Sequence, residues 1–247
     1  MIRRRPLLLL AAALLALAAP AAAYLLPGEA ILRKAAEKRA SLELTTVEAI
    51  GALELHGAAL PPGLPPATTA RLLVKTPGRA RLELLLTDGA EAERPAAMVK
   101  EERLAGRGGL ERPPAIAALV RGLATLLAWP TGAEGKALGE GLARRGVKVD
   151  EVSLGRFNGR LAWVLGGRLA DPKPAALALI DKESWMPLRL QVIEGGAAYD
   201  LRFIDWASAV GADRIPRVVE VWQGAELLVR FNTEKTAANP RLADSLF

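Results

Sequence analysis

Residues 160–235 read RLAWVLGGRLADPKPAALALIDKESWMPLRLQVIEGGAAYDLRFIDWASAVGADRIPRVVEVWQGAELLVRFNTEK, and this stretch decides the fold. Apolar side chains recur at spacings of two or four, as one face of a β-strand requires. These runs are Leu161, Trp163 and Leu165; Leu177 and Leu179; Leu188, Leu190 and Val192; Tyr199, Leu201 and Phe203; Val218 and Trp222; and Leu227, Val229 and Phe231. Gly, Pro and Asp pairs, such as Asp171-Pro172 and Gly195-Gly196, separate the runs and favour hairpins. We therefore predict five or six antiparallel strands that form a curved sheet with one apolar face.

The first half of the chain adds one helix and further strands. Apolar residues at helical spacing predict an amphipathic helix over 29–42 that packs on the sheet. Thr, Val and Ile favour a strand over 44–55, and apolar alternation predicts a hairpin over 69–87 and one short strand over 96–105. The proline cluster at 60–66 fits neither a helix nor a central strand, so we expect a surface loop there.

Two helices interrupt the strands over residues 113–145. The first has apolar residues at helical spacing, and only Arg121 is charged between Pro113 and Trp129. A helix this apolar is expected to be buried on more than one side. These apolar residues are Ile116, Leu119, Val120, Leu123, Leu126 and Leu127. The second helix, over 132–145, is weakened by its glycines. We expect the pair to fold back over the concave face of the sheet.

The N-terminus has the composition of an export signal. Three arginines at positions 3–5 precede an apolar run over 7–19 and three alanines at 21–23, so we predict a signal peptide over 1–23 that is cleaved before Tyr24. The alternative is a membrane anchor, but the run is shorter than the roughly 20 residues that a spanning helix needs. Residues 24–247 are then expected to form a single exported domain, and the composition favours the bacterial periplasm.

Charge and cysteine content narrow the partners. The net charge is +6, of which the three signal arginines contribute half, and aromatic residues make up 4% of the chain. A basic block and stacking aromatics are therefore missing, so we expect no nucleic-acid partner. The chain contains no cysteine, so burial rather than disulfides must stabilise it. We expect a monomer.

Catalytic motifs are also missing from the sequence. A lone histidine, His56, and the absence of cysteine exclude a thiol nucleophile and a multi-histidine metal site. No serine lies in a G-x-S-x-G motif. The carboxylate pairs Asp181 with Glu183 and Asp200 with Asp205 are interpreted as solvated face residues. We therefore expect a protein that is not an enzyme and binds neither cofactor nor metal.

Apolar surface is in excess. The mean hydropathy is +0.19, and several predicted strands are apolar on both faces. This excess is compatible with an ordinary thick core or with a sheet that encloses a ligand cavity. Composition by itself favours the solid core.

The order of elements, with short matching motifs, resembles the periplasmic lipoprotein carrier family of LolA-like and LolB-like proteins. Residues 72–77, LLVKTP, are similar to the family's strand that ends in V-K-x-P, and Asp181 to Gln191 is similar to its later meander. The resemblance implies an α+β fold: an open half β-barrel of about ten to eleven antiparallel strands, covered by an N-terminal helix and by a two-helix lid over 113–145. Family members often carry an arginine where this chain has Thr76, which leaves a regulated lid in question. A LolB-like acceptor is lipid-anchored, and the missing cysteine argues against that role.

The resemblance also implies a function. It indicates a periplasmic carrier that shields the acyl chains of lipoproteins or lipids and delivers them toward the outer membrane, with an inner-membrane exporter and an outer-membrane acceptor as further partners. The alternative is a periplasmic lipid-sensing or protein-binding regulatory module on the same fold. The residues expected to bind lipid are Leu72, Val74, Leu82, Leu84, Leu86, Ile116, Leu119, Leu123, Trp163, Leu190, Phe203 and Trp222.

Overall fold

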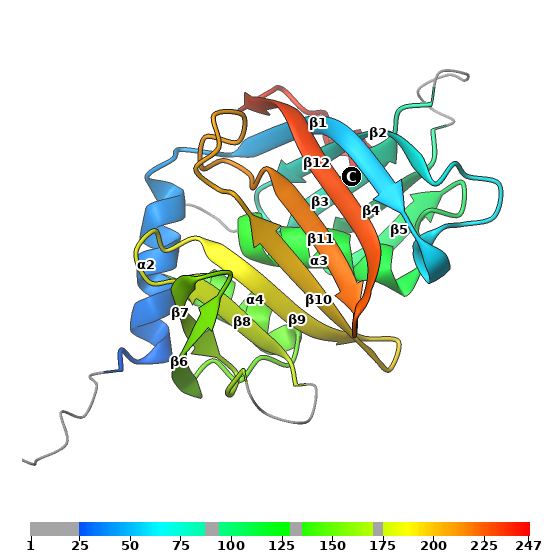
Figure 1. Cartoon of the computed structure of the whole chain (residues 1–247). Helices are drawn as coiled ribbons and strands as arrows, with labels where there is room; N and C mark the ends of the chain where they lie inside the picture. Colours follow the sequence, from blue (N-terminus) through cyan, green and yellow to red (C-terminus); the bar gives the residue numbers. More distant parts are fainter. Residues whose placement is uncertain (1–24, 87–93, 129–134, 170–174) are drawn as a thin grey trace, which may run out of the picture.

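The computed structural model describes residues 25–86, 94–128, 135–169 and 175–247. The predicted signal peptide over 1–23 lies outside these residues. The described chain forms one sheet of twelve antiparallel strands, which curves around a single apolar core (Figure 1). The described elements thus form an α+β open half-barrel, which confirms the predicted fold class.

The strands follow the chain in two series that meet at the middle of the sheet. Their order across it is β5-β4-β3-β2-β1-β12-β11-β10-β9-β8-β7-β6, so β5 and β6 form the two edges and the first strand pairs with the last. The bounds are β1 Thr46–Leu55, β2 Ala67–Lys75, β3 Arg79–Leu84, β4 Ala96–Lys100, β5 Arg103–Arg107, β6 Val152–Phe157, β7 Arg160–Leu165, β8 Leu177–Asp181, β9 Pro187–Glu194, β10 Ala197–Ile204, β11 Val218–Gln223 and β12 Glu226–Ala238.

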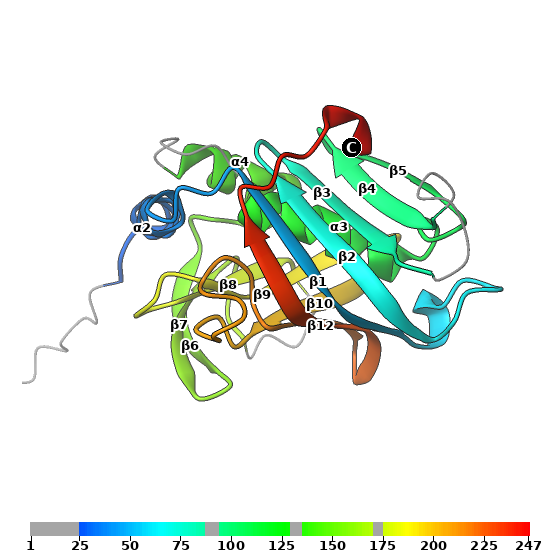
Figure 2. The ribbon, with the colours of Figure 1, turned by 90° about the horizontal axis from the view of Figure 1, so that it is seen from above.

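Helix α3, Pro114–Leu127, lies in the hollow of the curved sheet (Figure 2). It begins with proline at its first position, which suits a helix start because that N–H has no partner within the helix. The helix contacts β2, β3 and β4 in one half of the sheet and β9, β10 and β11 in the other half. Twelve of its residues are buried, as expected for a helix that is apolar around most of its circumference.

The other helices lie at the margin. Helix α2, Gly28–Ala40, packs mainly against α4, Lys136–Arg144, and α4 also contacts α3. The N-terminal helix was expected to pack on the sheet, but its main contact is with α4 instead. Glycine allows the close approach: a Cβ on Gly135 would lie 2.6 Å from the Arg33 nitrogen. Two short 3₁₀ segments, η1 Gly57–Ala59 and η3 Asp244–Leu246, follow β1 and β12.

The single strand predicted over 96–105 is a hairpin of two strands, β4 and β5. Its turn is formed by Glu101 and Glu102, both with positive φ (48° and 68°). A tight hairpin turn requires this backbone conformation, which Gly and Asn adopt most readily. Two glutamates give no turn signal, so the pattern predicted one strand too few, and the sheet has twelve strands rather than ten to eleven.

Candidate functional site

Ten of the twelve residues expected to bind lipid meet on the concave side of the sheet and on α3. Strand register places them on one face: Leu72 lies opposite Leu82, and Leu190 opposite Leu201. The ten expose 0–3% of their surface, so protein atoms already surround them. They are Leu72, Val74, Leu82, Leu84, Ile116, Leu119, Leu123, Trp163, Leu190 and Phe203. The sequence therefore predicted the inner face correctly, and the role of these residues in binding stays a prediction.

Trp222 does not belong to this face. Its indole Nε1 donates to Glu220 Oε2 at 2.8 Å, and the Arg202 guanidinium stacks 4.4 Å from the ring centroid, both on the outer side of the sheet. Val219 and Val221 of β11 face inward instead. Strand β11 is apolar at both parities, so alternation could not choose between them, and the placement of Trp222 among the inner residues is wrong. Leu86 lies beyond the end of β3 and is half-buried.

The hollow between the two halves of the sheet is filled by α3. A Cβ added to Gly122 would lie 2.3 Å from Leu201 Cδ2 and 3.3 Å from Leu190 Cδ2, so helix and sheet are in contact there. Leu119, about one turn before Gly122, and Leu123, the next residue, are 1% and 0% exposed. The open lipid cavity that the family resemblance implied is therefore closed in this conformation, as composition favoured.

Few directional interactions join α3 to the sheet. At its middle, Arg121 forms an ion pair with Glu194 of β9. At its C-terminus, the Ala128 carbonyl accepts a 2.6 Å hydrogen bond from the Gly78 N–H, in the turn between β2 and β3. The Leu127 carbonyl accepts a 3.4 Å bond from Arg39 of α2. Apolar packing, which has no required geometry, supplies the rest of the contact.

Three residues near the C-terminal end of α3 take roles that the sequence did not indicate. Thr76, at the position that often holds arginine in the resembling family, bonds the carbonyl of Thr45 and makes no hydrogen bond to α3 among the described residues. The neighbouring Gly78 holds α3 through its backbone. Burial lowers the pKa of Arg39 to about 10, and its guanidinium donates to the Arg214 carbonyl at 2.6 Å.

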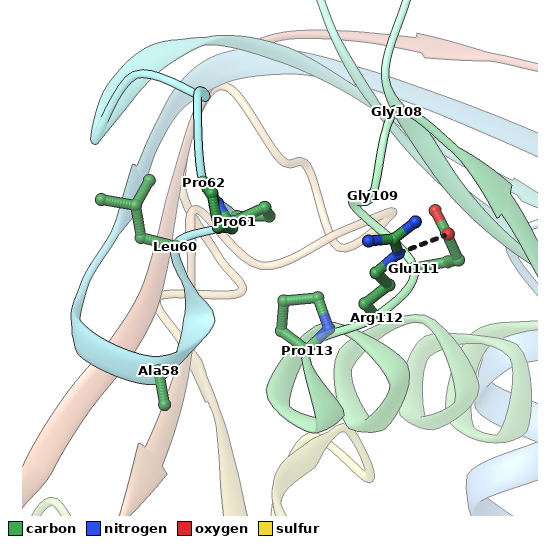
Figure 3. A pocket seen from close by; sticks show the side chains of 9 residues that line it. All are labelled: Ala58, Leu60, Pro61, Pro62, Gly108, Gly109, Glu111, Arg112 and Pro113. Atoms are coloured by element: carbon green, nitrogen blue, oxygen red, sulfur yellow. Dashed lines mark ion pairs between the residues drawn. The ribbon is translucent and has the colours of Figure 1, made fainter.

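An open pocket of about 610 Å³ lies at the N-terminal end of α3 (Figure 3). The loop after η1 forms one wall, and the segment that leads from β5 into α3 forms the other. Arg112, with 84% of its side chain exposed, is at the rim beside Glu111. The lining is Ala58, Leu60, Pro61, Pro62, Gly108, Gly109, Glu111, Arg112 and Pro113. The sequence placed the proline cluster in a surface loop but gave no sign that it faces the start of α3.

The carboxylates and the possible metal ligands of the described residues bear on the sequence predictions. No group of three metal-binding side chains lies together in the described ranges. Asp181 accepts hydrogen bonds from the Glu183 and Ser184 N–H groups at 3.0 and 2.6 Å, which caps a turn. Asp200 pairs with Arg189 and Arg202. Asp181 and Asp200 are 1% and 7% exposed, so their interpretation as solvated face residues is wrong. Within the same ranges, no helix is both long and apolar enough to traverse a bilayer.

The sequence matches no protein-family model, and no curated protein matches it. A solved LolA superfamily protein from Nitrosomonas europaea is similar in structure, with a TM-score of 0.52 and 11% identity over 90% of this chain and 98% of that one. Two further structures score lower: a DUF1329 family protein from Desulfovibrio piger (TM-score 0.38, 11% identity, 87% and 95% covered) and the lipoprotein LppX from Mycobacterium tuberculosis (0.27, 11%, 87% and 98%). The first similarity shows that the fold is LolA-like, as the sequence motifs indicated.

Proposed function

We propose that this protein binds the acyl chains of a lipid or lipoprotein in the concave face of its sheet, and that α3 is a plug which the acyl chains displace. The observation that carries the proposal is that a single apolar helix fills the whole hollow and contacts both halves of the sheet. Displacing that one element would expose a continuous apolar groove. The LolA-like fold supports the same reading.

The energies of plug and ligand are comparable. Burying a large apolar side chain contributes about 1.5–3 kcal/mol, so the six large apolar residues of α3 contribute about 9–18 kcal/mol. A 16-carbon acyl chain contributes about 12 kcal/mol at about 0.8 kcal/mol per CH₂. One chain would therefore roughly balance the loss of α3, and two chains would exceed it. We infer that a diacyl or triacyl ligand is preferred over a single fatty acid.

The pocket at the start of α3 offers a place for this exchange to begin. Leu60, Pro61 and Pro113 give it an apolar wall next to the first turn of the helix. An acyl end that enters there would contact the helix before it meets the closed core. Arg112, exposed at the rim, is placed to meet an anionic headgroup.

A reversible disulfide tests whether α3 must leave. The chain has no cysteine, so the variant Gly122→Cys/Leu201→Cys contains a single possible bridge. A Cβ at position 122 would lie 3.7 Å from Leu201 Cγ, the place that a cysteine sulfur at position 201 would take, so the two side chains are within reach of each other. We expect the oxidised protein to lose binding of a pyrene-labelled diacylglycerol and the reduced protein to regain it. The Leu201→Cys variant, treated identically, controls for the oxidant.

Thiol titration reports whether the bridge has formed. Equal lipid binding by the oxidised and reduced forms, with the bridge confirmed, would exclude exchange of α3 for lipid. In that case the concave face is an ordinary core, and any lipid is bound elsewhere on the protein.

We further propose that the protein acts in the periplasm after removal of residues 1–23, with residues 24–247 as one domain, and carries its ligand from an inner-membrane exporter to an outer-membrane acceptor. The test is transfer: the protein should extract a lipoprotein from inner-membrane vesicles and release it to acceptor vesicles. A protein that binds lipid but transfers none would contradict this step alone.

The close contact of Gly122 with Leu201 favours a second candidate, a protein-binding regulatory module on the same fold. A module of this kind would keep α3 in place and use its outer surface. It predicts that the oxidised disulfide variant keeps its partner binding while lipid has no effect, which distinguishes it from the carrier.

A further inference from the structure

Four cations form a row across the outer face of the sheet. Lys75, Arg79, Lys100 and Arg103 lie directly opposite one another on β2, β3, β4 and β5. Neighbouring strands are about 4.8 Å apart, so this cation row is about 14 Å long. Like charges that face each other across strands destabilise a sheet. Folding alone therefore does not account for the row.

Protection of a sheet edge does not account for it either. Charged side chains, lysine above all, often line an edge strand and prevent it from pairing with other chains. Only β5 is an edge here, while β2, β3 and β4 are paired on both sides. Three of the four cations therefore stand where no edge needs protection.

The C-terminal segment 241–247, which we call the tail, covers half of the row (Figure 2). Asp244 Oδ1 accepts hydrogen bonds from Lys75 Nζ at 2.7 Å and from Arg79 Nη1 at 2.6 Å. These two cations hold the pKa of Asp244 below its ordinary value of 3.8. A carboxylate is thus the group that this half of the row binds.

Backbone carbonyls of the tail are bound as well. The Leu242 carbonyl accepts from Lys75 Nζ at 2.8 Å, and the Leu246 carbonyl accepts from Arg81 Nη1 at 2.6 Å. The tail itself is largely exposed, with 70% of the Asp244 side chain in solvent. Exposed ion pairs contribute little to stability, so another peptide of the same chemistry can replace the tail.

Within the described chain, the tail makes no hydrogen bond or ion pair to the other half of the row. Among the described residues, neither Lys100 nor Arg103 forms an ion pair with a carboxylate. Both line an open pocket of about 350 Å³ together with Glu101, which pairs with neither cation among the described residues, and Phe247, three residues beyond Asp244. A carboxylate at the position of Phe247 would therefore lie beside Lys100 and Arg103.

We propose that the cation row binds an acidic segment of a partner protein in place of the tail, and that this segment carries two carboxylates three residues apart. The first carboxylate takes the position of Asp244 between Lys75 and Arg79. The second pairs with Lys100 and Arg103. The segment's backbone carbonyls meet Lys75 and Arg81, as those of the tail do.

The test uses the full chain with Asp244→Lys, which repels the tail from the row. Two fluorescein-labelled peptides with amidated C-termini are compared by anisotropy: Leu-Ala-Asp-Ser-Leu-Phe, the sequence of 242–247, and the same peptide with glutamate in place of phenylalanine. We expect the glutamate peptide to bind about tenfold more tightly at low salt, with a difference that shrinks as salt is added. Equal affinities of the two peptides would overturn the proposal.

Matched charge reversals locate the site. Arg103→Glu lies on one edge strand, and Arg156→Glu lies on the opposite edge strand β6, where it is equally exposed and makes the same change in net charge. We expect Arg103→Glu to lower the affinity for the glutamate peptide at least about tenfold, and Arg156→Glu to change this affinity by less than about twofold. Equal losses would show nonspecific attraction and overturn the proposal. Arg103→Gln, checked for folding by circular dichroism, should also weaken binding.

Vesicles separate a peptide site from a membrane site. The Asp244→Lys protein is mixed with phosphatidylglycerol vesicles. If the vesicles bind through Arg103 and the glutamate peptide does not displace them, the row recognises a lipid surface and the proposal is overturned. Vesicle binding that is absent or displaced by the peptide would support it. The lipid-exchange test on the disulfide variant is independent of these results.

Discussion

Arg81 Nη2 donates a 3.0 Å hydrogen bond to Glu83 Oε1 on the outer face of β3, where the two side chains are 3% and 0% exposed. Arg71 approaches the other carboxylate oxygen at 2.6 Å, and Arg107 lies 3.3 Å from the first. One buried carboxylate therefore pairs with arginines from three strands, β2, β3 and β5. A buried charge is tolerated only with such partners.

Glu83→Gln is expected to destabilise the fold by about 2–4 kcal/mol, because the substitution removes the carboxylate charge that three partly buried arginines share. Arg107, with 35% of its side chain exposed, reaches water and limits the loss. Urea unfolding at pH 7 measures the change. Glu140→Gln on α4, where the carboxylate is 56% exposed, is the control and should shift stability by less than about 0.5 kcal/mol.

The same residue predicts a pH dependence. Burial acts to raise the pKa of Glu83, but hydrogen bonds and charges from Arg71 and Arg81 outweigh it and hold the pKa below its ordinary 4.5. The unfolded chain therefore binds the proton first, and the contribution of Glu83 is lost as pH falls below about 4.5. We expect the gap in stability between wild type and Glu83→Gln to narrow from pH 6 to pH 3. A constant gap would contradict this assignment.

The contact of Gly122 with Leu201 predicts that α3 tolerates no larger side chain on this face. Gly122→Ala gains helix propensity of about 1 kcal/mol, yet its Cβ would lie 2.3 Å from Leu201 Cδ2 inside a closed core. Overpacking a core costs about 1–3 kcal/mol, so we expect a net loss of up to about 2 kcal/mol. The loss would appear in the urea midpoint, together with stronger binding of a hydrophobic dye as α3 is pushed outward.

Gly139→Ala on α4 is the matched control. A Cβ there meets only the tip of Leu32 at 3.1 Å, so this helix should gain stability or stay unchanged. Equal effects of the two substitutions would show that α3 does not fit tightly against β10.

The sequence predicted the inner face well because the alternation of apolar residues can be recognised within each strand separately. Leu72 and Leu82 come from different strands, yet each follows the alternation of its own strand, and pairing places them opposite each other. Trp222 was misplaced because β11 is apolar at both parities. Its ring packs beneath Arg202 and bonds Glu220, contacts that no periodicity encodes.

Features that depend on register could not be predicted in the same way. The cation row joins Lys75, Arg79, Lys100 and Arg103, which the sequence scatters among acidic neighbours and only the strand pairing aligns. The β4–β5 hairpin on which half of the row lies was itself missed. The sequence also could not show that α3 fills the hollow. An apolar helix is compatible with a lid over an open cavity and with a plug inside it, and only the packing distinguishes the two.

Asp244 should titrate below its ordinary pKa of 3.8. Hydrogen bonds from Lys75 and Arg79 are the main cause, and their charges add to the effect. Because the docked tail holds the depressed pKa, docking is intact above pH 3.8 and is lost as pH falls through the depressed value. Carboxyl carbon NMR of the full chain measures the pKa. In Lys75→Gln/Arg79→Gln it should return toward 3.8, and an unchanged value would show that the tail does not dock on these cations.

Arg39 predicts how firmly the C-terminal end of α3 is held. Its buried guanidinium joins α2 to the last turn of α3 through the Leu127 carbonyl and also binds the Arg214 carbonyl. Burial lowers the pKa of Arg39 to about 10, so keeping the charge inside is costly and the two carbonyls must compensate. In Arg39→Met the apolar stem is retained and the donors are lost. The buried carbonyls are then unpaired, which costs about 1–3 kcal/mol.

We expect hydrogen exchange over residues 124–128 of this variant to accelerate more than exchange over 115–119. Lipid binding should be faster because the plug opens more easily. Uniform acceleration along α3 would show that Arg39 supports the whole fold instead of holding one end of the helix.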